Sequence, residues 1–394
     1  MTDLLTPLIL TAAIILAYPL LSVYLVLLER KVLADFQVRL GPMRVGPHGL
    51  LQPLADALKL VLKEDIIPRD ADKAIFWIAP VVATFSALTA FAVLPFSQKL
   101  YVADINVGLL FISAMGALAV LGIILGGWAS NSHYSLLGAL RASAQLVSYE
   151  VALSLALLGP VMAAGSLSMV EIVTSQQNRG IWFAFDNFGL MIVPFVIFMI
   201  SAIAEVNRVP FDLPEAEAEL VAGFHTEFSG FRWALYMLGE SASTFVVCCV
   251  AATLFLGGWL RPFPNVHWLD IPLGYAAPAI LITGPGVMSL RLALRLRKGA
   301  EKIGLIAFAL LLIVIGLLLL APMVNQAVSG PFWFFVKVVS LFYGMVWLRG
   351  TLPRFRYDQL MNIGWKILIP LGLAAIIVNA VVQILVLNET HLNR

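Results

Sequence analysis

Long apolar runs, separated by short polar segments, set the pattern of this 394-residue chain. Each run is long enough for a helix to cross the hydrocarbon core of a bilayer. The runs lie at 4–28, 74–96, 107–128, 136–163, 188–204, 235–258, 303–322, 331–349 and 366–387, and a weaker, proline-containing run lies at 276–294. The pattern predicts an all-α, polytopic transmembrane helix bundle that forms a single integral membrane domain over residues 1–394.

The distribution of lysine and arginine predicts how the bundle is oriented. Bases gather in 29–73, 291–302 and 349–366, and loops rich in these residues stay on the cytoplasmic side of a membrane. The opposite side holds only Lys99, Arg179, Arg261 and Arg394. We therefore expect a multi-pass protein of the bacterial inner membrane with both termini in the periplasm.

The number of membrane crossings decides whether the weak run at 276–294 also spans the membrane. The cytoplasmic loops before and after this region belong on one side of the membrane, so an even number of crossings must separate them. Because 303–322 crosses, 276–294 must cross as well, which gives ten spans with a cytoplasmic turn at 291–302. The alternative is that the turn forms an interfacial amphipathic helix with Arg291 and Arg295 on one face.

Composition and motif content exclude several classes of function. The chain is 61% hydrophobic and 12% charged, and its 25 Lys and Arg nearly balance 23 Asp and Glu, so we expect no nucleic acid partner. Cys248 and Cys249 are adjacent in an apolar run, the five histidines lack metal-ligand spacing, and neither a GxGxxG motif nor a P-loop is present. We expect the chain itself to bind no metal, nucleotide or other cofactor.

Six acidic residues crowd into a cytoplasmic loop at 205–235. They are Glu205, Asp212, Glu215, Glu217, Glu219 and Glu227. Acids this close repel one another and titrate as a coupled group, and carboxylates at a membrane boundary commonly handle protons or bind a polar headgroup. The alternative is helix capping by Asp212 and Glu215 around Pro214, which leaves most of the group unexplained.

Glu150, Glu240 and Lys337 are charged residues that fall inside predicted spans. An isolated charge in the bilayer costs several kcal/mol, so each must be neutral, paired or beside water. Paired polar contacts between helices are one interpretation, and the helix of Glu150 carries a suitable polar stripe. That stripe is Arg141, Gln145 and Ser148. Together with the acidic loop, Glu150 and Glu240 also suggest a path of carboxylates into the bilayer.

The first loop, 29–73, carries a second informative pattern. Two Gly-Pro pairs mark turns, and after Pro53 charged and apolar residues alternate at helical spacing. The charged ones are Asp56, Lys59 and Lys63, and the apolar ones are Leu54, Leu58 and Val61. This predicts a short amphipathic helix along the membrane surface.

Four motifs closely resemble a single protein family. They are ERKVLADFQVRLGPMRVGPHGLLQPLADALKL at 29–60, SLLGALRASAQLVSYE at 135–150, AEVNRVPFDLPEAEAELVAGFHTEFSGF at 204–231 and LPRFRYDQLM at 352–361. The family is the H subunit of bacterial NADH–quinone oxidoreductase, whose mitochondrial counterpart is subunit 1 of respiratory complex I. The resemblance covers 1–260 and 327–390 in order, whereas 265–327 departs from the family pattern as an extra hairpin insertion.

The resemblance implies a membrane subunit that helps form the chamber for quinone reduction and couples this reaction to proton translocation. By resemblance, the quinone-binding residues are Glu29, Arg30, Arg39, Asp56, Ala57, Arg354 and Arg356. The family's funnel of acids corresponds to Glu150, Glu205, Glu215, Glu217, Glu219, Glu227 and Glu240, to which we add Asp212. Iron–sulfur clusters, FMN and NADH are then held by partner subunits. The expected partners are quinone, membrane lipid, iron–sulfur and quinone-site peripheral subunits and antiporter-like membrane subunits, with no activity expected of the chain alone.

Three other functions remain as alternatives. A stand-alone proton or cation transporter is expected to show internal repeats with broken helices, and the sequence shows no such repeat. The corresponding subunit of a membrane-bound hydrogenase is expected to lack the first-loop motif and the EAEAE run at 215–219, both present here. A passive anchor for peripheral subunits fits the basic loops but leaves Glu150 and Glu240 without a role.

Overall fold

The computed structural model describes residues 2–212, 221–295 and 299–392. Throughout this part the chain is helical, and an isolated bridge between Ser97 and Leu100 is its only β pairing. The longer helices are α1 (Thr2–Phe36), α3 (Lys73–Thr89), α4 (Gly108–Ala129), α5 (His133–Ala164), α9 (Gly230–Phe255), α10 (Ala277–Arg295), α11 (Ala300–Leu318), α12 (Pro322–Thr351) and α14 (Ile369–Leu392). The shorter ones are α2 (Gln52–Leu62), α6 (Met169–Arg179), α7 (Ile192–Glu205) and α13 (Tyr357–Asn362).

The apolar runs of the sequence coincide with these helices. Eight helices are long and apolar enough to cross a membrane, and α7 and α11 are shorter apolar helices at the two remaining positions. The multi-pass, all-α fold predicted from the sequence is therefore confirmed. The amphipathic helix predicted after Pro53 is also confirmed as α2, with this proline in its first turn.

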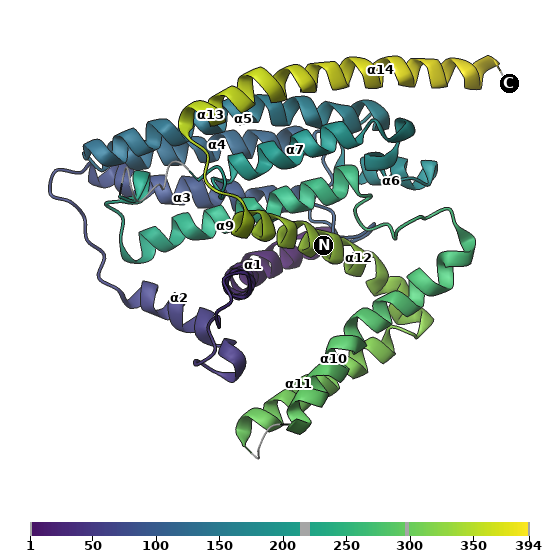
Figure 1. Cartoon of the computed structure of the whole chain (residues 1–394), viewed down its shortest axis with the longest axis horizontal. Helices are drawn as coiled ribbons and strands as arrows, with labels where there is room; N and C mark the ends of the chain where they lie inside the picture. Colours follow the sequence, from purple (N-terminus) through teal and green to yellow (C-terminus); the bar gives the residue numbers. More distant parts are fainter. Residues whose placement is uncertain (1, 213–220, 296–298, 393–394) are drawn as a thin grey trace.

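The core of the bundle is centred on α9, which contacts α1, α3, α7 and α12 (Figure 1). Every side chain from Thr244 to Phe255 is buried. Several of them are small, including Cys248, Cys249, Ala251 and Ala252. Small side chains let helices approach closely, which is how helices associate in a membrane, where burial from water gives no driving force between them.

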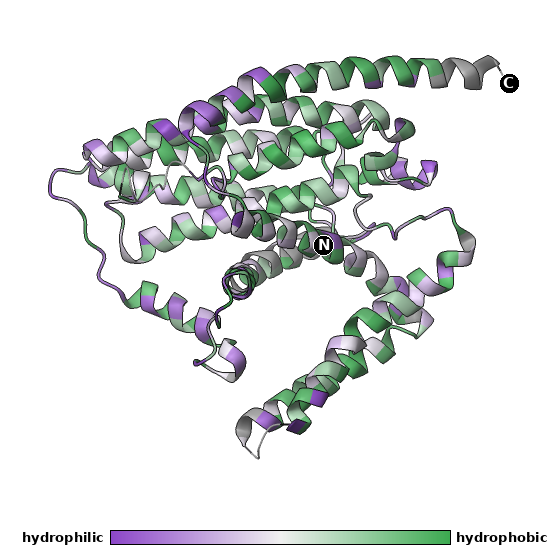
Figure 2. Ribbon diagram, in the orientation of Figure 1, coloured by the Kyte–Doolittle hydropathy of each residue, from purple (hydrophilic) through white to green (hydrophobic). Residues whose placement is uncertain are grey.

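Helices α10 and α11 form a hairpin that projects from the rest of the bundle (Figure 1). A methyl group on Gly286 would come within 3.1 Å of the carbonyl oxygen of Ala309, and one on Gly316 within 3.1 Å of that of Ala279. These two pairings require an antiparallel arrangement. The hairpin is apolar along its length and polar towards its free end (Figure 2).

Several element boundaries differ from the sequence prediction. The turn expected at 291–302 is shorter than predicted, because α10 continues to Arg295 and α11 begins at Ala300. Residues 291–295 therefore belong to the end of α10 and residues 300–302 to the start of α11, whereas 296–298 lie outside the described residues. Helix α12 begins at Pro322, well before the expected 331, because a membrane helix tolerates an internal proline such as Pro331.

Helix α6 was not expected from the apolar pattern, because it is amphipathic and short. Its local signals are nevertheless present in the sequence. Ser168 caps it by accepting a hydrogen bond from the backbone N–H of Glu171, and Gly180 ends it in the left-handed conformation, at φ 72°.

Candidate buried charge site

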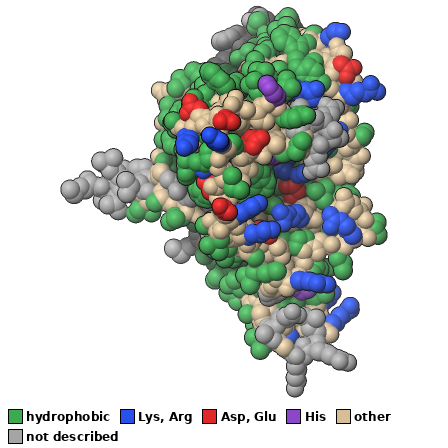
Figure 3. Space-filling view, turned by 90° about the vertical axis from the view of Figure 1, so that its left-hand side faces the viewer, with side chains coloured by type: hydrophobic (Ala, Val, Ile, Leu, Met, Phe, Trp, Pro, Cys, Tyr) green, Lys and Arg blue, Asp and Glu red, His purple; other side chains and the backbone are tan. Residues whose placement is uncertain are grey.

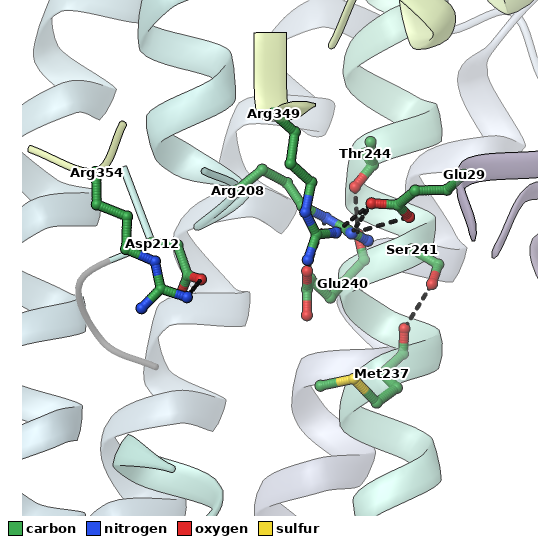
Figure 4. Close-up of polar contacts among 9 residues, drawn as sticks. All are labelled: Glu29, Arg208, Asp212, Met237, Glu240, Ser241, Thr244, Arg349 and Arg354. Carbon is green, nitrogen blue, oxygen red and sulfur yellow. Dashed lines mark hydrogen bonds and ion pairs between the residues drawn. The ribbon is translucent and has the colours of Figure 1, made fainter. Parts of the chain in front are cut away.

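Four charged side chains meet inside the bundle, and we call them the buried cluster: Glu29, Arg208, Glu240 and Arg349 (Figure 4). The Nη1 atom of Arg208 lies 2.9 Å from Oε1 and 3.1 Å from Oε2 of Glu29. Its Nε lies 2.8 Å from Oε1 of Glu240. Arg349 also donates to Glu29. Arg208 therefore bridges two carboxylates, and the charges of the four groups cancel.

Each member of the buried cluster comes from a different element. Glu29 is near the end of α1, Arg208 follows α7, Glu240 lies on α9 and Arg349 is in the last turn of α12. The side chain of Glu29 is 8% exposed and those of Arg208 and Glu240 are 17% and 19% exposed. Charges so far from water persist only when paired with good geometry. The cluster consequently connects four elements of the fold and also forms a polar site.

Asp212 lies beside this cluster and pairs with Arg354, whose Nη2 is 3.0 Å from its Oδ2 (Figure 4). Burial raises the pKa of Asp212 to about 6, and the opposing attraction of Arg354 only partly offsets this effect. Burial is the main cause and Glu240 is the only described acid that adds repulsion, so this raised pKa does not test the coupled-acid interpretation of the loop. The capping alternative also involves Pro214 and Glu215, which lie outside the described residues. Glu217 and Glu219 lie outside them as well.

A cavity of about 90 Å³ adjoins the buried cluster and reaches into the bundle. Glu205 and Glu240 both line it, with Asn207 and Tyr236. Glu205 also lines a second cavity, of about 70 Å³, formed by α3, α4, α5, α7 and α9. The two spaces share Glu205, so this carboxyl lies between them.

Glu150 extends this row of carboxylates into α5. It is half-buried and close enough to Glu205 for like-charge repulsion. Glu227, by contrast, is half-buried in the segment before α9 and is not among the residues that line either cavity. Of the described acids that the resemblance assigns to a funnel, Glu150, Glu205 and Glu240 are thus brought together and Glu227 is not.

The polar stripe on α5 serves packing, in agreement with one interpretation of the sequence. Nε2 of Gln145 donates to the carbonyl oxygens of Ala204 at 2.7 Å and Phe211 at 2.8 Å. This pairing satisfies backbone acceptors at the end of α7 and fixes the segment that carries Arg208. The Oγ of Ser148 accepts from Nε1 of Trp365 at 3.2 Å and ties α5 to the C-terminal helices.

Lys337 also has a structural role, rather than a place in a proton path. Its Nζ donates to the carbonyl oxygens of Leu256 at 2.6 Å, Gly258 at 2.9 Å and Leu260 at 2.5 Å. It also lies 4.3 Å from the ring centre of Trp182. The ammonium group therefore satisfies the carbonyls that α9 and the following turn leave unpaired.

The first loop places some of the quinone-binding candidates around a third cavity, of about 360 Å³. Arg30 and Asp56 line it and form an ion pair at 2.7 Å, and Lys59, Lys63 and Trp233 line it as well. The surface of this part of the protein carries many exposed bases and acids (Figure 3).

The remaining candidates from the resemblance are distributed more widely. Ala57 is half-buried on α2 beside Asp56. Arg39 is exposed and donates to Gln37 at 2.6 Å, and Arg356 is exposed at the start of α13. Glu29 belongs to the buried cluster, and Arg354 binds Asp212. Seven residues assigned to one tunnel are therefore found in three different environments.

One buried ion pair was missed in the sequence. Arg232 is 1% exposed, and its Nη2 lies 2.6 Å from Oδ2 of Asp65. Its guanidinium also lies 4.3 Å from the ring centre of Trp77 and 5.0 Å from that of Phe76. This contact joins the first loop to the start of α9. The available signal was an arginine at the head of an apolar run, where a charge needs a partner.

These features define an integral membrane protein with a charge-balanced site buried at one end of a helical bundle and carboxylate-lined cavities leading from it. Comparison with known proteins gives the family. The chain matches the family described as NADH dehydrogenase over residues 9–380. It therefore belongs to this family, and its relatives are H subunits of NADH-quinone oxidoreductase.

Three relatives show the extent of the similarity. The second NADH-quinone oxidoreductase H subunit of Solibacter usitatus (strain Ellin6076) is 63% identical over 379 residues, which cover 96% of each chain. The first H subunit of Koribacter versatilis (strain Ellin345) is 49% identical, and the match covers 96% of this chain and 92% of the relative. The H subunit of Rickettsia bellii (strain OSU 85-389) is 42% identical, with 89% and 85% covered. The family assigned by resemblance from the motifs is thus confirmed.

Proposed function

We propose that the chain is the membrane subunit of a proton-pumping NADH–quinone oxidoreductase that forms part of the quinone chamber and couples quinone reduction to proton translocation. Membership of the H-subunit family supports the assignment to this enzyme. The observation that supports the coupling role is that Glu240 belongs to the buried cluster and also lines the cavity that Glu205 lines.

In this proposal quinone reaches the protein from the bilayer beside the first loop. The cavity between α2 and α9 is open, and it combines the apolar ring of Trp233 with the charges of Arg30 and Asp56. An apolar wall suits a quinone tail, and a polar group suits its headgroup. Quinone is a substrate in this scheme. The iron–sulfur clusters, FMN and NADH belong to partner subunits, and the chain has no activity alone.

Arg208 carries the coupling step in this proposal. Because it bridges Glu29 and Glu240, protonation of either acid leaves the arginine paired with the other. A change of charge at the chamber, felt first by Asp212 and Glu29, then biases the protonation of Glu240 at the cavity. Glu205 and Glu150 continue the path towards antiporter-like subunits.

The charge distribution supports the orientation that we propose. The first loop, the buried cluster and the start of α13 face the cytoplasm, where the iron–sulfur and quinone-site subunits dock. Both termini are then periplasmic, and the bacterial inner membrane is the location. These assignments follow the excess of lysine and arginine in the loops on one side.

A cavity-filling substitution tests the quinone role. Leu60 lines the cavity between α2 and α9, and Leu60→Trp is expected to lower quinone reduction by the assembled complex about tenfold or more, because it fills the space a quinone would occupy. NADH oxidation by a hydrophilic acceptor that bypasses quinone should be unchanged. The matched control is Leu62→Trp, on the same helix, at a side chain that is 82% exposed. Equal loss of both reactions, or equal effects of both variants, would refute the quinone role of this cavity.

A further inference from the structure

The hairpin of α10 and α11 has no part in the proposed quinone or proton chemistry. Its two helices meet along a seam of small residues, including Ala279, Gly286, Ala309 and Gly316. Most of its larger apolar side chains are exposed, such as Met288 and Ile303. An apolar surface on both helices is what lipid contact requires.

The base of the hairpin is fixed to the bundle. Nδ2 of Asn325, a buried side chain on α12, donates to the carbonyl oxygens of Gly274 at 2.9 Å and Leu319 at 3.0 Å. The first of these carbonyls precedes α10 and the second follows α11. One amide group therefore holds both ends of the hairpin, and this sets the direction in which it projects (Figure 1).

Bases lie at the ends of α10 and α11 that are far from the bundle, and among the described residues they are Arg291, Arg295 and Lys302. In sequence, segment 291–302 carries five bases and one acid, Glu301. The bases are Arg291, Arg295, Arg297, Lys298 and Lys302. The side chains of Arg291 and Arg295 are exposed, and Figure 2 shows polar positions towards this end of an otherwise apolar hairpin. Bases at the end of a membrane-crossing helix lie at the level of the lipid headgroups.

The hairpin also reaches the first loop. Helix α11 contacts the turn Pro47–Gly49, and Nζ of Lys31 on α1 donates to the carbonyl oxygen of His48 in that turn at 2.6 Å. Arg44, three residues before the turn, is exposed. The hairpin and the loop thus present bases from distant parts of the sequence in one region.

We propose that the free end of the α10–α11 hairpin and the adjoining turn Pro47–Gly49 bind acidic phospholipid headgroups of the cytoplasmic leaflet. The partner follows from charge complementarity, because exposed bases meet the headgroup level beside an apolar surface that suits acyl chains. The hairpin then keeps acidic lipid next to the first loop. The lipid chemistry is independent of the quinone role, and only the leaflet rests on the proposed orientation.

Photo-crosslinking from the turn tests this proposal in the whole complex. Gly299→Cys places a reactive group there without strain, because this glycine has an extended backbone, at φ 176°, and a Cβ atom at this position has nothing within 4 Å. Cys248 and Cys249 are buried and will not compete. A maleimide carrying a photoreactive group is attached, and the complex is placed in nanodiscs with equal amounts of radiolabelled phosphatidylglycerol and phosphatidylcholine. After illumination, the protein chain is isolated by gel and the two labels are counted.

The expected result is several-fold more crosslinking to phosphatidylglycerol than to phosphatidylcholine. Each base near an anionic surface is worth about a five-fold factor in lipid binding, since about 1 kcal/mol is expected per charge. Replacing Arg291, Arg295 and Lys302 together by glutamine should therefore lower the ratio at least about five-fold. Replacing the two arginines by lysine should preserve it. Amide hydrogen exchange of α10 and α11 checks that the hairpin is intact in each variant.

Several outcomes would overturn the proposal. They are an equal yield with both lipids, a ratio that survives the triple neutralisation in an intact hairpin, and crosslinking to another subunit in place of lipid. Displacement of phosphatidylglycerol by inorganic phosphate at equal ionic strength would show a small-anion site instead. Reaction of the Gly299→Cys variant with an impermeant maleimide from the periplasmic side would refute the leaflet and the ten-span topology, while leaving the quinone test unaffected.

Discussion

The buried cluster and the α10–α11 hairpin differ in which side chains they bury and in which contacts stabilise them. The cluster holds Glu29, Arg208, Glu240 and Arg349 out of water and survives because the charges are paired. The hairpin exposes apolar side chains on both helices and is held together by a seam of small residues. Specific ion pairs stabilise the buried cluster, whereas close backbone packing stabilises the hairpin.

The difference shows how much one side chain matters in each region. Removing Arg208 from the cluster leaves the buried Glu240 without this base, so the effect is large and spreads over several elements. Adding a methyl group at the hairpin seam changes a local packing distance, and the effect should remain within the two helices. Substitutions in the cluster, at the seam and beside the cluster test this contrast, in decreasing order of expected size.

Loss of Arg208 should have the largest effect. Arg208→Met leaves Glu240 without this base and Glu29 with Arg349 alone, and breaking a buried pair costs about 3–5 kcal/mol. We expect the amount of assembled subunit in membranes to fall more than about tenfold, with an intermediate level for Arg208→Lys, which keeps the charge but not the two-sided geometry.

The control for this prediction is a more exposed pair elsewhere in the bundle. Asp186→Asn weakens the 2.7 Å pair with Arg179, whose side chain is 41% exposed, and such pairs contribute about 0–1 kcal/mol. It should leave the amount of assembled subunit near that of the wild type. Normal assembly of Arg208→Met would show that the four charges do not tie the helices together.

A substitution at the hairpin seam should have an intermediate effect. A Cβ atom on Gly316 would lie 2.3 Å from Cγ2 of Thr283, so Gly316→Val must push the helices apart, at a cost of about 1–3 kcal/mol. We expect faster amide hydrogen exchange in α10 and α11 and unchanged exchange in α9. Gly304→Val is the matched control on the same helix, because a Cβ atom there has nothing within 4 Å. Similar exchange rates in the two variants would show that α10 and α11 do not pack along this seam.

The sequence predicted the fold better than the site, and the reason is physical. Apolar length and helical periodicity are local properties, so the spans and α2 were found from short windows of sequence. The turn of the hairpin was predicted too long because both flanking helices continue through basic residues that remain compatible with a helix, up to Arg295 on one side and from Ala300 on the other.

The partners in the site depend on positions far apart in the chain. Glu29 and Arg208 are separated by 179 positions, and Glu29 and Arg349 by 320. Composition indicates that a buried charge needs a partner but does not say which one. Lys337 illustrates this point, because its partners are backbone carbonyls, which carry no signal in the sequence.

The pair of Asp212 and Arg354 should show the smallest effect, as a shift in pH dependence. The pKa of Asp212 is about 6 because burial disfavours the carboxylate, and the attraction of Arg354 lowers it in part. Arg354→Gln removes this attraction, so the pKa should rise further. Since the side chain of Arg354 is 46% exposed, solvent screens the attraction, and we expect a shift of about half a unit to one unit.

The direction of the shift follows from the protonation states. Above pH 6 Asp212 is ionised and paired, whereas below it the carboxyl is neutral. An acid with a raised pKa contributes most to stability at low pH, below its unfolded value, and this contribution is lost as the pH rises through about 6. In Arg354→Gln the loss should extend to a higher pH, because the folded pKa rises and the unfolded value does not change. Quinone-linked turnover measured from about pH 5 to 8 should accordingly show its acidic limb displaced to higher pH. Asp212→Asn, which cannot ionise, should abolish the limb, and exposed Arg356→Gln should leave it in place.

An acidic limb at the same pH in Arg354→Gln as in the wild type would mean that this pair does not set the protonation of the chamber. The buried cluster would then respond to quinone by another route, with Glu29 as the first acid to consider, because it is paired with both Arg208 and Arg349.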